Sequence, residues 1–262
     1  MKISVQEIKN LKNKKKIVCL TAYSYPIAKI LDESCDLILV GDSLGMTIYG
    51  YEDTIDVTLD MMINHGLAVT KAAKKAFVVV DLPSNTYEDS KYQALRSAKE
   101  VISKTNCDAI KIETTPELIE TTKFLVENGV NVMGHIGLLP QHVRKIGGYK
   151  YQGKDDESAK KIIETAKQLE EAGVFSIVIE AVPAKLADRI TKEISIPTIG
   201  IGASKNCDGQ ILVIDDLLGL NQEFMPKFVK KYSDLVKEIS SAAENYKNDV
   251  EEQKFPAPEN EL

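Results

Sequence analysis

The sequence has few of the features that mark membrane, secreted or nucleic-acid-binding proteins. No apolar run approaches the roughly 20 residues of a membrane span, and the start, MKISVQEIKN, lacks the apolar core of a signal peptide. A net positive charge is also absent: 39 acidic residues outnumber 33 basic ones, and the formal net charge of -6 argues against a protein that binds phosphate backbones. We therefore expect a cytoplasmic protein whose partners are neither nucleic acid nor membrane.

Cysteines and linkers are also scarce. Cys19, Cys35, Cys107 and Cys207 show no CxxC or other metal-ligand spacing, so buried free thiols are expected and not a disulfide framework or a zinc site. No low-complexity stretch or Pro/Ser-rich linker divides the 262 residues. A single domain over 1–262 is expected, with a flexible C-terminal tail from about residue 248 to residue 262.

What the sequence does have is a series of short β-branched apolar runs. Their continuous apolar character is typical of parallel strands that are buried on both faces. The runs cover 17–23, 37–43, 77–83, 109–113, 131–137, 175–182, 196–203 and 210–216.

Helical patterns lie between several of these runs. The clearest covers 156–172 with Gly173 as its stop; another begins at Pro116 after a capping Thr115 and ends at Gly129. A further helix is expected after Pro226. About eight strand-helix units in a chain of this length predict a closed (β/α)8 TIM barrel. A doubly wound open sheet is the alternative.

Acidic residues stand at the ends of four predicted strands: Asp42, Asp81, Glu113 and Glu180. A single Asp after a strand is usually a turn residue or a helix cap, but in a barrel all these strand ends converge on one face. Clustered carboxylates raise one another's pKa values unless a cation neutralises them. Oxygen ligands with no nearby Cys and few His favour Mg²⁺ over zinc.

Two other polar side chains are expected at the same face. Lys111 lies two residues before Glu113, so both side chains point to the same side of the strand. Spacing alone does not decide whether Lys111 binds a substrate anion or only pairs with a carboxylate. Among the histidines, His135 ends a strand and is placed in the site, whereas His65 and His142 are expected to be ordinary surface or core residues.

The segment 138–156, LLPQHVRKIGGYKYQGKDD, is long for a strand-to-helix connection. Long loops on this face of a barrel typically act as lids or ligand contacts. Its mixture of tyrosines and basic residues could suggest RNA, but the acidic net charge argues against that function.

An ordered set of motifs gives the chain a resemblance to a known family. VGDSLGM, VVVDLP, KIE, GHIGLLPQ, GYKYQG, VIEAVPA and DGQILVIDDLLG occur in this order and span roughly residues 17 to 220. Together they resemble the ketopantoate hydroxymethyltransferase family. Each motif alone is weak, but the ordered set is specific and agrees with the barrel predicted from the strand pattern.

The resemblance implies an activity and roles for particular residues. The activity is Mg²⁺-dependent transfer of a hydroxymethyl group from 5,10-methylenetetrahydrofolate to 3-methyl-2-oxobutanoate, which forms 2-dehydropantoate for pantothenate and coenzyme A synthesis. One Mg²⁺ per subunit would be held by Asp42 and Asp81, with Glu113 in its shell directly or through water. The resemblance also implies a homodecamer. The remaining roles it implies are Glu180 as general base, and Asp42, Ser43, Asp81, Lys111 and His135 as substrate-binding residues.

Some positions depart from the family pattern without replacing a proposed ligand or the base. They are Ser24, Ser84, Asn85, Thr114, Thr115 and Ser204. Two other functions remain open: a Mg²⁺-dependent carbon-carbon lyase or mutase of the phosphoenolpyruvate mutase superfamily, and a non-catalytic barrel that binds an oxo acid. The lyases and mutases generally carry a reactive cysteine loop, which is not found in this sequence.

Overall fold

The computed structural model describes residues 2–222 and 225–261. The chain forms two compact units, the first ending at Val213 and the second beginning at Ile214. The first unit holds eight strands, all paired in parallel, that close into a barrel in the order β1 to β8. The predicted (β/α)8 barrel is confirmed. The strands are β1 Ile17–Thr21, β2 Leu37–Val40, β3 Phe77–Asp81, β4 Ala109–Glu113, β5 Val132–Gly137, β6 Ser176–Glu180, β7 Thr198–Ile201 and β8 Gly209–Leu212.

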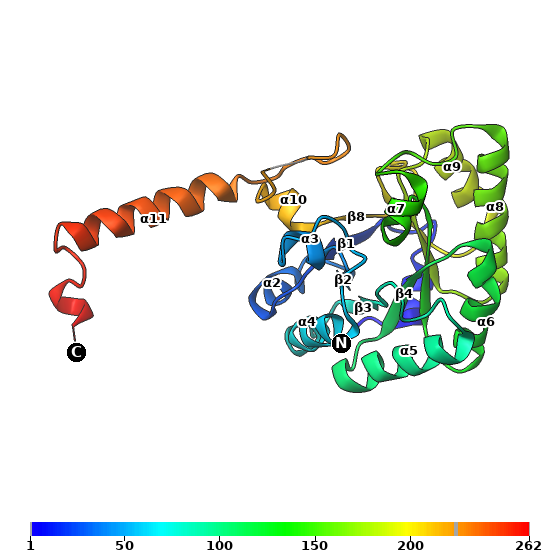
Figure 1. The fold of residues 1–262 in the computed structure, drawn as a ribbon, viewed down its shortest axis with the longest axis horizontal. Helices are drawn as coiled ribbons and strands as arrows, with labels where there is room; N and C mark the ends of the chain where they lie inside the picture. The colour runs from blue at the N-terminus through cyan, green and yellow to red at the C-terminus, as the bar shows by residue number, and fades with distance from the viewer. Residues whose placement is uncertain (1, 223–224, 262) are drawn as a thin grey trace. The chain divides into compact units, whose positions relative to one another are not determined.

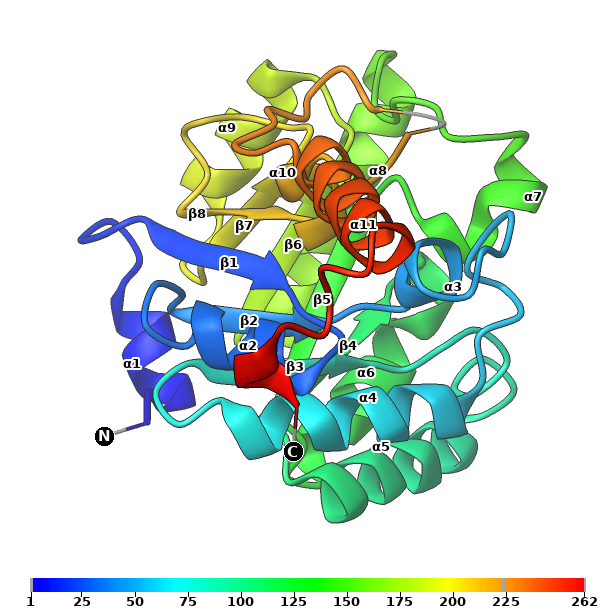
Figure 2. The same ribbon diagram turned by 90° about the vertical axis from the view of Figure 1, so that its left-hand side faces the viewer.

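Helices surround the strands of the first unit (Figure 1). Figure 2 shows α4 and α5 side by side on the outside of the barrel, where α4 contacts β2 and β3 and α5 contacts β4. The helices of this unit are α1 Val5–Asn10, α2 Tyr25–Leu31, α3 Leu44–Thr47, α4 Leu59–Ala72, α5 Lys91–Thr105, α6 Ile119–Glu127, α7 Val143–Ile146, α8 Asp156–Glu171 and α9 Ala184–Glu193, with 3₁₀ turns η1 Pro116–Leu118 and η2 Pro140–His142.

The helix signals in the sequence act as expected at two stops. Gly129 and Gly173 end α6 and α8 with φ angles of +81° and +88°, a backbone region that favours glycine. At the start of α8, the Asp155 side chain accepts a hydrogen bond from the backbone N–H of Ser158 at 2.9 Å. Pro116 opens the 3₁₀ turn η1, and α6 follows from Ile119.

Apolar side chains fill the middle of the barrel. The core cluster includes Val79 of β3, Ala109 of β4, Met133 of β5 and Val178 of β6. Side chains alternate across a strand, so a residue two or four positions further along points to the same side. The barrel interior above this apolar layer is therefore lined by polar residues at the carboxyl ends of the strands.

The four cysteines are buried free thiols, as predicted: Cys19, Cys35, Cys107 and Cys207. Within the part of the chain that the structure describes, no helix is both long enough and apolar enough to cross a membrane. The expectation of one domain with a flexible tail stays a prediction, although all eight strands lie in the first unit.

The second unit contains α10 Ile214–Leu218, α11 Leu235–Glu251 and the 3₁₀ turn η3 Pro258–Asn260. The predicted helix start after Pro226 is wrong, because α11 begins only at Leu235. Asp234 sets this start, since its side chain accepts a hydrogen bond from the N–H of Lys237 at 3.4 Å. The apolar residues before Asp234 have helical spacing, but Tyr232 instead donates its N–H to the carbonyl of Leu217 at 2.8 Å.

Candidate active site

Six side chains gather inside the carboxyl end of the barrel, and we call them the active-site cluster. Asp81 and Lys111 lie opposite each other in the register of β3 and β4, and Glu113 lies opposite His135 in that of β4 and β5. Glu180 ends β6, and Asp42 follows β2 by two residues. The active-site cluster consists of Asp42, Asp81, Lys111, Glu113, His135 and Glu180.

Asp81 and Lys111 form the best-buried ion pair of the cluster. Lys111 Nζ lies 3.0 Å from Asp81 Oδ1, and the two side chains are 6% and 2% exposed. The contact is close enough for an ion pair but is not aligned as a hydrogen bond. Asp81 Oδ2 accepts the backbone N–H of Asp42 at 3.1 Å. The loop after β2 is thereby joined to the end of β3.

Lys111, His135 and Glu180 contact one another in sequence at the carboxyl ends of β4, β5 and β6. Lys111 Nζ lies 3.4 Å from His135 Nδ1, and His135 Nε2 lies 3.2 Å from Glu180 Oε2. Because an ammonium group can only donate, Nδ1 is the acceptor and the ring carries its proton on Nε2, toward Glu180. Burial and the charge of Lys111 lower the pKa of His135, so the ring is neutral. Glu180 therefore lies beside a neutral ring, in a contact that is close but, like that of Asp81 with Lys111, not aligned as a hydrogen bond.

Burial raises the pKa values of the three inner acids. Burial and the charge of Asp42 raise the pKa of Asp81 to about 7, and the opposite effect of Lys111 only partly offsets this increase. The pKa of Asp42 is also raised by burial, and that of Glu113 lies well above its usual range because of burial and the nearby Asp42. For Lys111, burial alone would lower the pKa, but the carboxylates of Asp81, Asp42 and Glu113 outweigh it and raise the pKa.

These shifts describe a site that is short of positive charge, with three buried acids against one buried ammonium group. A divalent cation would supply that charge, and its oxygen ligands would be carboxylates of the kind that Mg²⁺ prefers. Within residues 2–222 and 225–261, no three His, Cys, Asp or Glu side chains already stand together as a metal-ligand group. Mg²⁺ commonly uses only one or two protein carboxylates together with water and substrate oxygens, so this donor set fits it.

Ser43 lies at the edge of the cluster, where its Oγ is 2.8 Å from the hydroxyl of Tyr23. Gly41 has no side chain, and a Cβ there would lie 2.8 Å from Ser43 Oγ and 3.7 Å from Asp81 Oδ2. A side chain at position 41 would therefore crowd Ser43 Oγ, whereas the distance to Asp81 is an ordinary contact.

Two residues of η2 that no sequence pattern predicts also belong to the site. The Gln141 N–H lies 3.1 Å from each carboxylate oxygen of Glu113, and His142 Nδ1 lies 3.3 Å from Glu113 Oε2. His142, expected to be an ordinary histidine, therefore contacts the cluster, while His65 on α4 lies near the Tyr49 hydroxyl at 3.1 Å. The only available signal was the position of η2 in the long segment that follows β5.

The positions that depart from the family pattern are spread around the barrel. Thr114 and Thr115 follow Glu113 directly, and Thr114 is buried. Asn85 takes a left-handed backbone conformation with φ of 65°. Ser204 hydrogen-bonds Asp188 of α9, and Ser24 precedes α2 without a side-chain capping bond.

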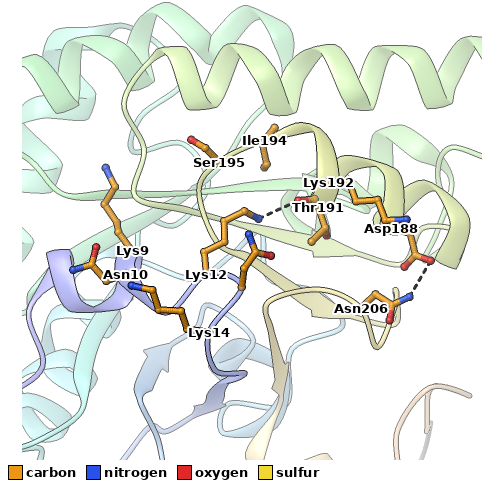
Figure 3. A pocket seen from close by; sticks show the side chains of 11 residues that line it. Lys9, Asn10, Lys12, Lys14, Asp188, Thr191, Lys192, Ile194, Ser195 and Asn206 are labelled. Carbon is orange, nitrogen blue, oxygen red and sulfur yellow. Dashed lines mark hydrogen bonds between the residues drawn. The ribbon is translucent and has the colours of Figure 1, made fainter.

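A separate pocket lies at the opposite, amino end of the barrel (Figure 3). Its walls come from segments that precede β1, β7 and β8, and they include Lys9, Lys14 and Lys192. Lys12 also lines it, but the Lys12 ammonium group is bound to the carbonyl of Thr191 at 3.0 Å. Since none of the acids of the active-site cluster lines this pocket, it is not the site of the proposed chemistry.

A closed barrel with titratable groups buried at the carboxyl ends of its strands has the general arrangement of a barrel enzyme. Residues 2–258 match the ketopantoate hydroxymethyltransferase family, and the chain belongs to that family. The chain is 52% identical over 243 residues to the 3-methyl-2-oxobutanoate hydroxymethyltransferase of Rhodospirillum rubrum, covering 93% of this chain and 87% of that protein. The enzyme of the same name from Brucella canis is 49% identical over 258 residues, covering 98% and 94%.

Solved structures with a similar fold are much more distant in sequence. They include 2,3-dimethylmalate lyase, with a TM-score of 0.64 and 12% identity over 98% of this chain and 90% of that chain. A phosphonopyruvate hydrolase in complex with oxalate and Mg²⁺ has a TM-score of 0.62 and 10% identity, covering 98% and 93%. At this identity the likeness shows a shared fold alone. The family match therefore identifies the chain as a transferase and favours the main hypothesis over the lyase alternative.

Proposed function

We propose that the chain transfers a hydroxymethyl group from 5,10-methylenetetrahydrofolate to 3-methyl-2-oxobutanoate and forms 2-dehydropantoate for pantothenate and coenzyme A synthesis. Family membership supports the reaction. The observation that carries it to particular residues is the series Asp81, Lys111, His135 and Glu180, whose neighbouring members lie 3.0 to 3.4 Å apart at the carboxyl end of the barrel. This series has a carboxylate at each end and a buried ammonium group between them, which supports Glu180 as the base.

The oxo acid would bind between these groups. Lys111 supplies a buried positive charge for the substrate carboxylate or for negative charge that develops on its keto oxygen. Ser43 supplies a hydroxyl at the edge of the cluster, and His135 an N–H on the side of Glu180. Apolar residues of the same strands, among them Val79 and Met133, lie in the core beneath the cluster.

Asp42 and Asp81 would hold one Mg²⁺ per chain, with Glu113 bound directly or through water. When bound, Mg²⁺ acts as a Lewis acid that withdraws electron density from an oxo acid and makes its C3 proton easier to remove. The raised pKa values of Asp42, Asp81 and Glu113 support this assignment, because they mark carboxylates that lack enough positive charge around them.

Glu180 would remove the C3 proton. Its carboxylate is partly exposed, unlike the deeply buried inner acids, and it lies 3.2 Å from the neutral ring of His135. The C3 electron pair then forms the new bond to the methylene carbon of the folate. Both bonds from that carbon to the folate nitrogens break, and water supplies the hydroxyl group. The two nitrogens take up two protons, the one that Glu180 removed from C3 and one from the water.

The direct test is an assay of the purified chain with 3-methyl-2-oxobutanoate, methylenetetrahydrofolate and Mg²⁺. Folate-dependent formation of 2-dehydropantoate is expected. Binding of the oxo acid without any reaction would support the non-catalytic barrel, and cleavage of a carbon-carbon bond without folate would support the lyase alternative.

The family resemblance also leads us to propose a homodecamer. Exposed apolar side chains in each unit are compatible with burial between copies of the chain: Tyr25 and Ile30 on α2 are 47% and 68% exposed, and Ile239 and Tyr246 on α11 are 56% and 58% exposed. Light scattering coupled to gel filtration should give the mass of ten chains. The mass of one chain would contradict this proposal without affecting the proposed reaction.

A further inference from the structure

Gln141 joins three loops at the carboxyl end of the barrel. The residue is 5% exposed, and its N–H contacts both oxygens of Glu113 at 3.1 Å. Its side-chain Nε2 donates to Asp42 Oδ2 at 2.8 Å and to the carbonyl of Leu82 at 3.0 Å, and its Oε1 accepts from the hydroxyl of Tyr87 at 2.6 Å. A single side chain thus connects the segments that follow β2 and β3 with η2, which follows β5.

The partners of Gln141 fix the orientation of its amide group. The Leu82 carbonyl can only accept, and Nε2 has two hydrogens to give, so Nε2 faces Leu82 and Asp42. Burial, with the nearby charge of Glu113, holds the pKa of Tyr87 well above its ordinary value, so the phenol keeps its proton and donates it to Oε1. In the opposite amide orientation, the Gln141 NH₂ group would face the Tyr87 hydroxyl, which is a donor, and Oε1 would face the Asp42 carboxylate, which is an acceptor.

We propose that Gln141 is a positioning residue that holds Asp42 and Glu113 in fixed orientations for the bound cation and oxo acid, and that Tyr87 supports it. The inference rests on the proposed function. Gln141 would act through the two acids, and its own amide hydrogens are already used by Asp42 and Leu82.

The need for such a residue follows from the burial of two acids. Asp42 and Glu113 are 5% and 1% exposed, and Gln141 donates a hydrogen bond to each carboxylate. Without Gln141, the Asp42 carboxylate would lose the hydrogen bond from Nε2, and the charge of Lys111 would draw it away from its present orientation. The Gln141 side chain also ties η2 to the Leu82 carbonyl, which keeps the backbone N–H of Gln141 at Glu113. Partners of metal ligands in other proteins typically contribute 10- to 100-fold in metal affinity or activity.

Two substitutions test the role. Gln141→Glu keeps the size of the side chain but puts a carboxylate against Asp42, and Gln141→Leu removes all side-chain hydrogen bonds. Binding of Mn²⁺ to the full chain without substrates, measured by electron paramagnetic resonance, should weaken by about 10- to 100-fold in Gln141→Leu and further in Gln141→Glu. A matched control is Gln210→Leu, which removes the bond from Gln210 Nε2 to the Ser204 carbonyl and should leave Mn²⁺ binding unchanged. Wild-type Mn²⁺ affinity in both Gln141 variants would overturn the proposal.

Tyr87→Phe provides a milder variant in case the Gln141 variants fold poorly. It removes only the hydroxyl that supports Oε1, so Mn²⁺ binding should weaken less than in Gln141→Leu, and KM for the oxo acid should rise more than kcat falls. In the double variant, Tyr87→Phe should add little to Gln141→Leu, because its effect passes through the missing amide. If Tyr87→Phe weakens Mn²⁺ binding equally in the wild-type chain and in Gln141→Leu, Tyr87 does not act through Gln141. If Tyr87→Phe alone leaves both Mn²⁺ binding and KM unchanged, Tyr87 has no positioning role.

Failure of this inference is distinguishable from failure of the proposed function. If the wild-type chain neither binds Mn²⁺ nor forms product, the proposed function fails, and the positioning role fails with it. If the wild-type chain binds Mn²⁺ and forms product while the Gln141 variants behave like it, the positioning role alone is wrong.

Discussion

At the amino end of the barrel, the carboxylate of Asp208 is surrounded by donors that belong to the fold. Its Oδ2 accepts from Lys12 Nζ at 2.7 Å and from the backbone N–H of Thr198 at 2.9 Å. Asp32, at the same end, accepts three backbone N–H groups at 2.8 to 2.9 Å. Burial would raise the pKa of Asp32, but the hydrogen bonds from Ala76, Lys74 and Lys75 outweigh it and lower the pKa.

The acids at the carboxyl end are buried as deeply but are incompletely compensated. Asp81 and Glu113 are 2% and 1% exposed, and their pKa values are raised, although Lys111 lies beside Asp81. A buried acid that the fold already satisfies contributes to stability, whereas one that lacks a counter-charge is suited to binding a cation from outside. The same residue type therefore serves the fold at one end of the barrel and the proposed chemistry at the other.

Asp81→Ala should have the largest effect on binding. It removes a proposed ligand, so Mg²⁺-dependent binding of 3-methyl-2-oxobutanoate should be lost, a larger effect than the 10- to 100-fold typical of residues that only support ligands. Calorimetry with and without Mg²⁺ measures this directly, and Asp42→Ala should behave in the same way. Undiminished binding that still requires Mg²⁺ would contradict the role of the replaced acid.

Asp208→Ala should affect stability instead. It leaves the ammonium group of Lys12, 8% exposed, without its carboxylate, and breaking a buried pair in this way costs about 3–5 kcal/mol in the free energy of unfolding. Urea unfolding checks this value, and kcat/KM of the folded fraction should stay near that of the wild type. A large loss of kcat/KM with normal stability would contradict the assignment of Asp208 to stability and of the acids at the carboxyl end to the proposed chemistry.

The pH dependence of stability sharpens the comparison. Because the pKa of Asp81 rises to about 7 in the fold from an ordinary value near 3.8, the metal-free folded chain binds more protons than the unfolded chain between these values. Its stability should therefore fall as pH rises from about 4 to about 7. Mg²⁺ needs the ionised acids, so the increase in Tm on adding Mg²⁺ should be a few degrees larger at pH 8 than at pH 5.5. An equal increase in Tm at both pH values would contradict the inference that Mg²⁺ binds acids that otherwise hold protons below about pH 7.

Asp32→Asn should have the smallest effect. The amide replaces one accepting oxygen with a donor that faces backbone N–H groups, which costs about 1–3 kcal/mol. The pKa of Asp32 is lowered in the fold, so the ionised carboxylate stabilises the wild type relative to Asp32→Asn at neutral pH. This difference in the free energy of unfolding should be lost as pH falls through the lowered pKa. Urea unfolding at two pH values measures this, and a variant that is equally destabilised in acid would contradict it.

The barrel, and most of the residues at its carboxyl end, could be predicted from the sequence. Apolar runs that end in Asp81, Glu113 and Glu180 predict parallel strands with acids on one face, and the alternation of side chains places Lys111 and Glu113 on the same side. These predictions depend only on local periodicity and on the closure of the sheet. The structure brings the residues together as expected, while their roles in catalysis and metal binding stay predictions.

Gln141 could not be predicted in the same way. It lies outside any strand, and its partner Asp42 is 99 residues away, so the contact exists only after the segment following β5 folds over the barrel. The start of α11 was missed for a related reason: apolar spacing continues before Asp234, and only the capping bond to Lys237 marks where the helix begins. Periodicity identifies faces of regular elements but not the contacts of loops and caps.

In the proposed reaction, Glu180 removes the C3 proton of the oxo acid. Exchange of that proton with D₂O, followed by NMR without folate, separates proton removal from one-carbon transfer. The wild-type chain with Mg²⁺ should catalyse exchange, and Glu180→Gln should bind Mg²⁺ and the oxo acid normally but exchange about 10² to 10⁴ times more slowly, because the amide cannot accept the proton. Exchange at the wild-type rate per bound substrate in Glu180→Gln would contradict the claim and limit Glu180 to its contact with His135.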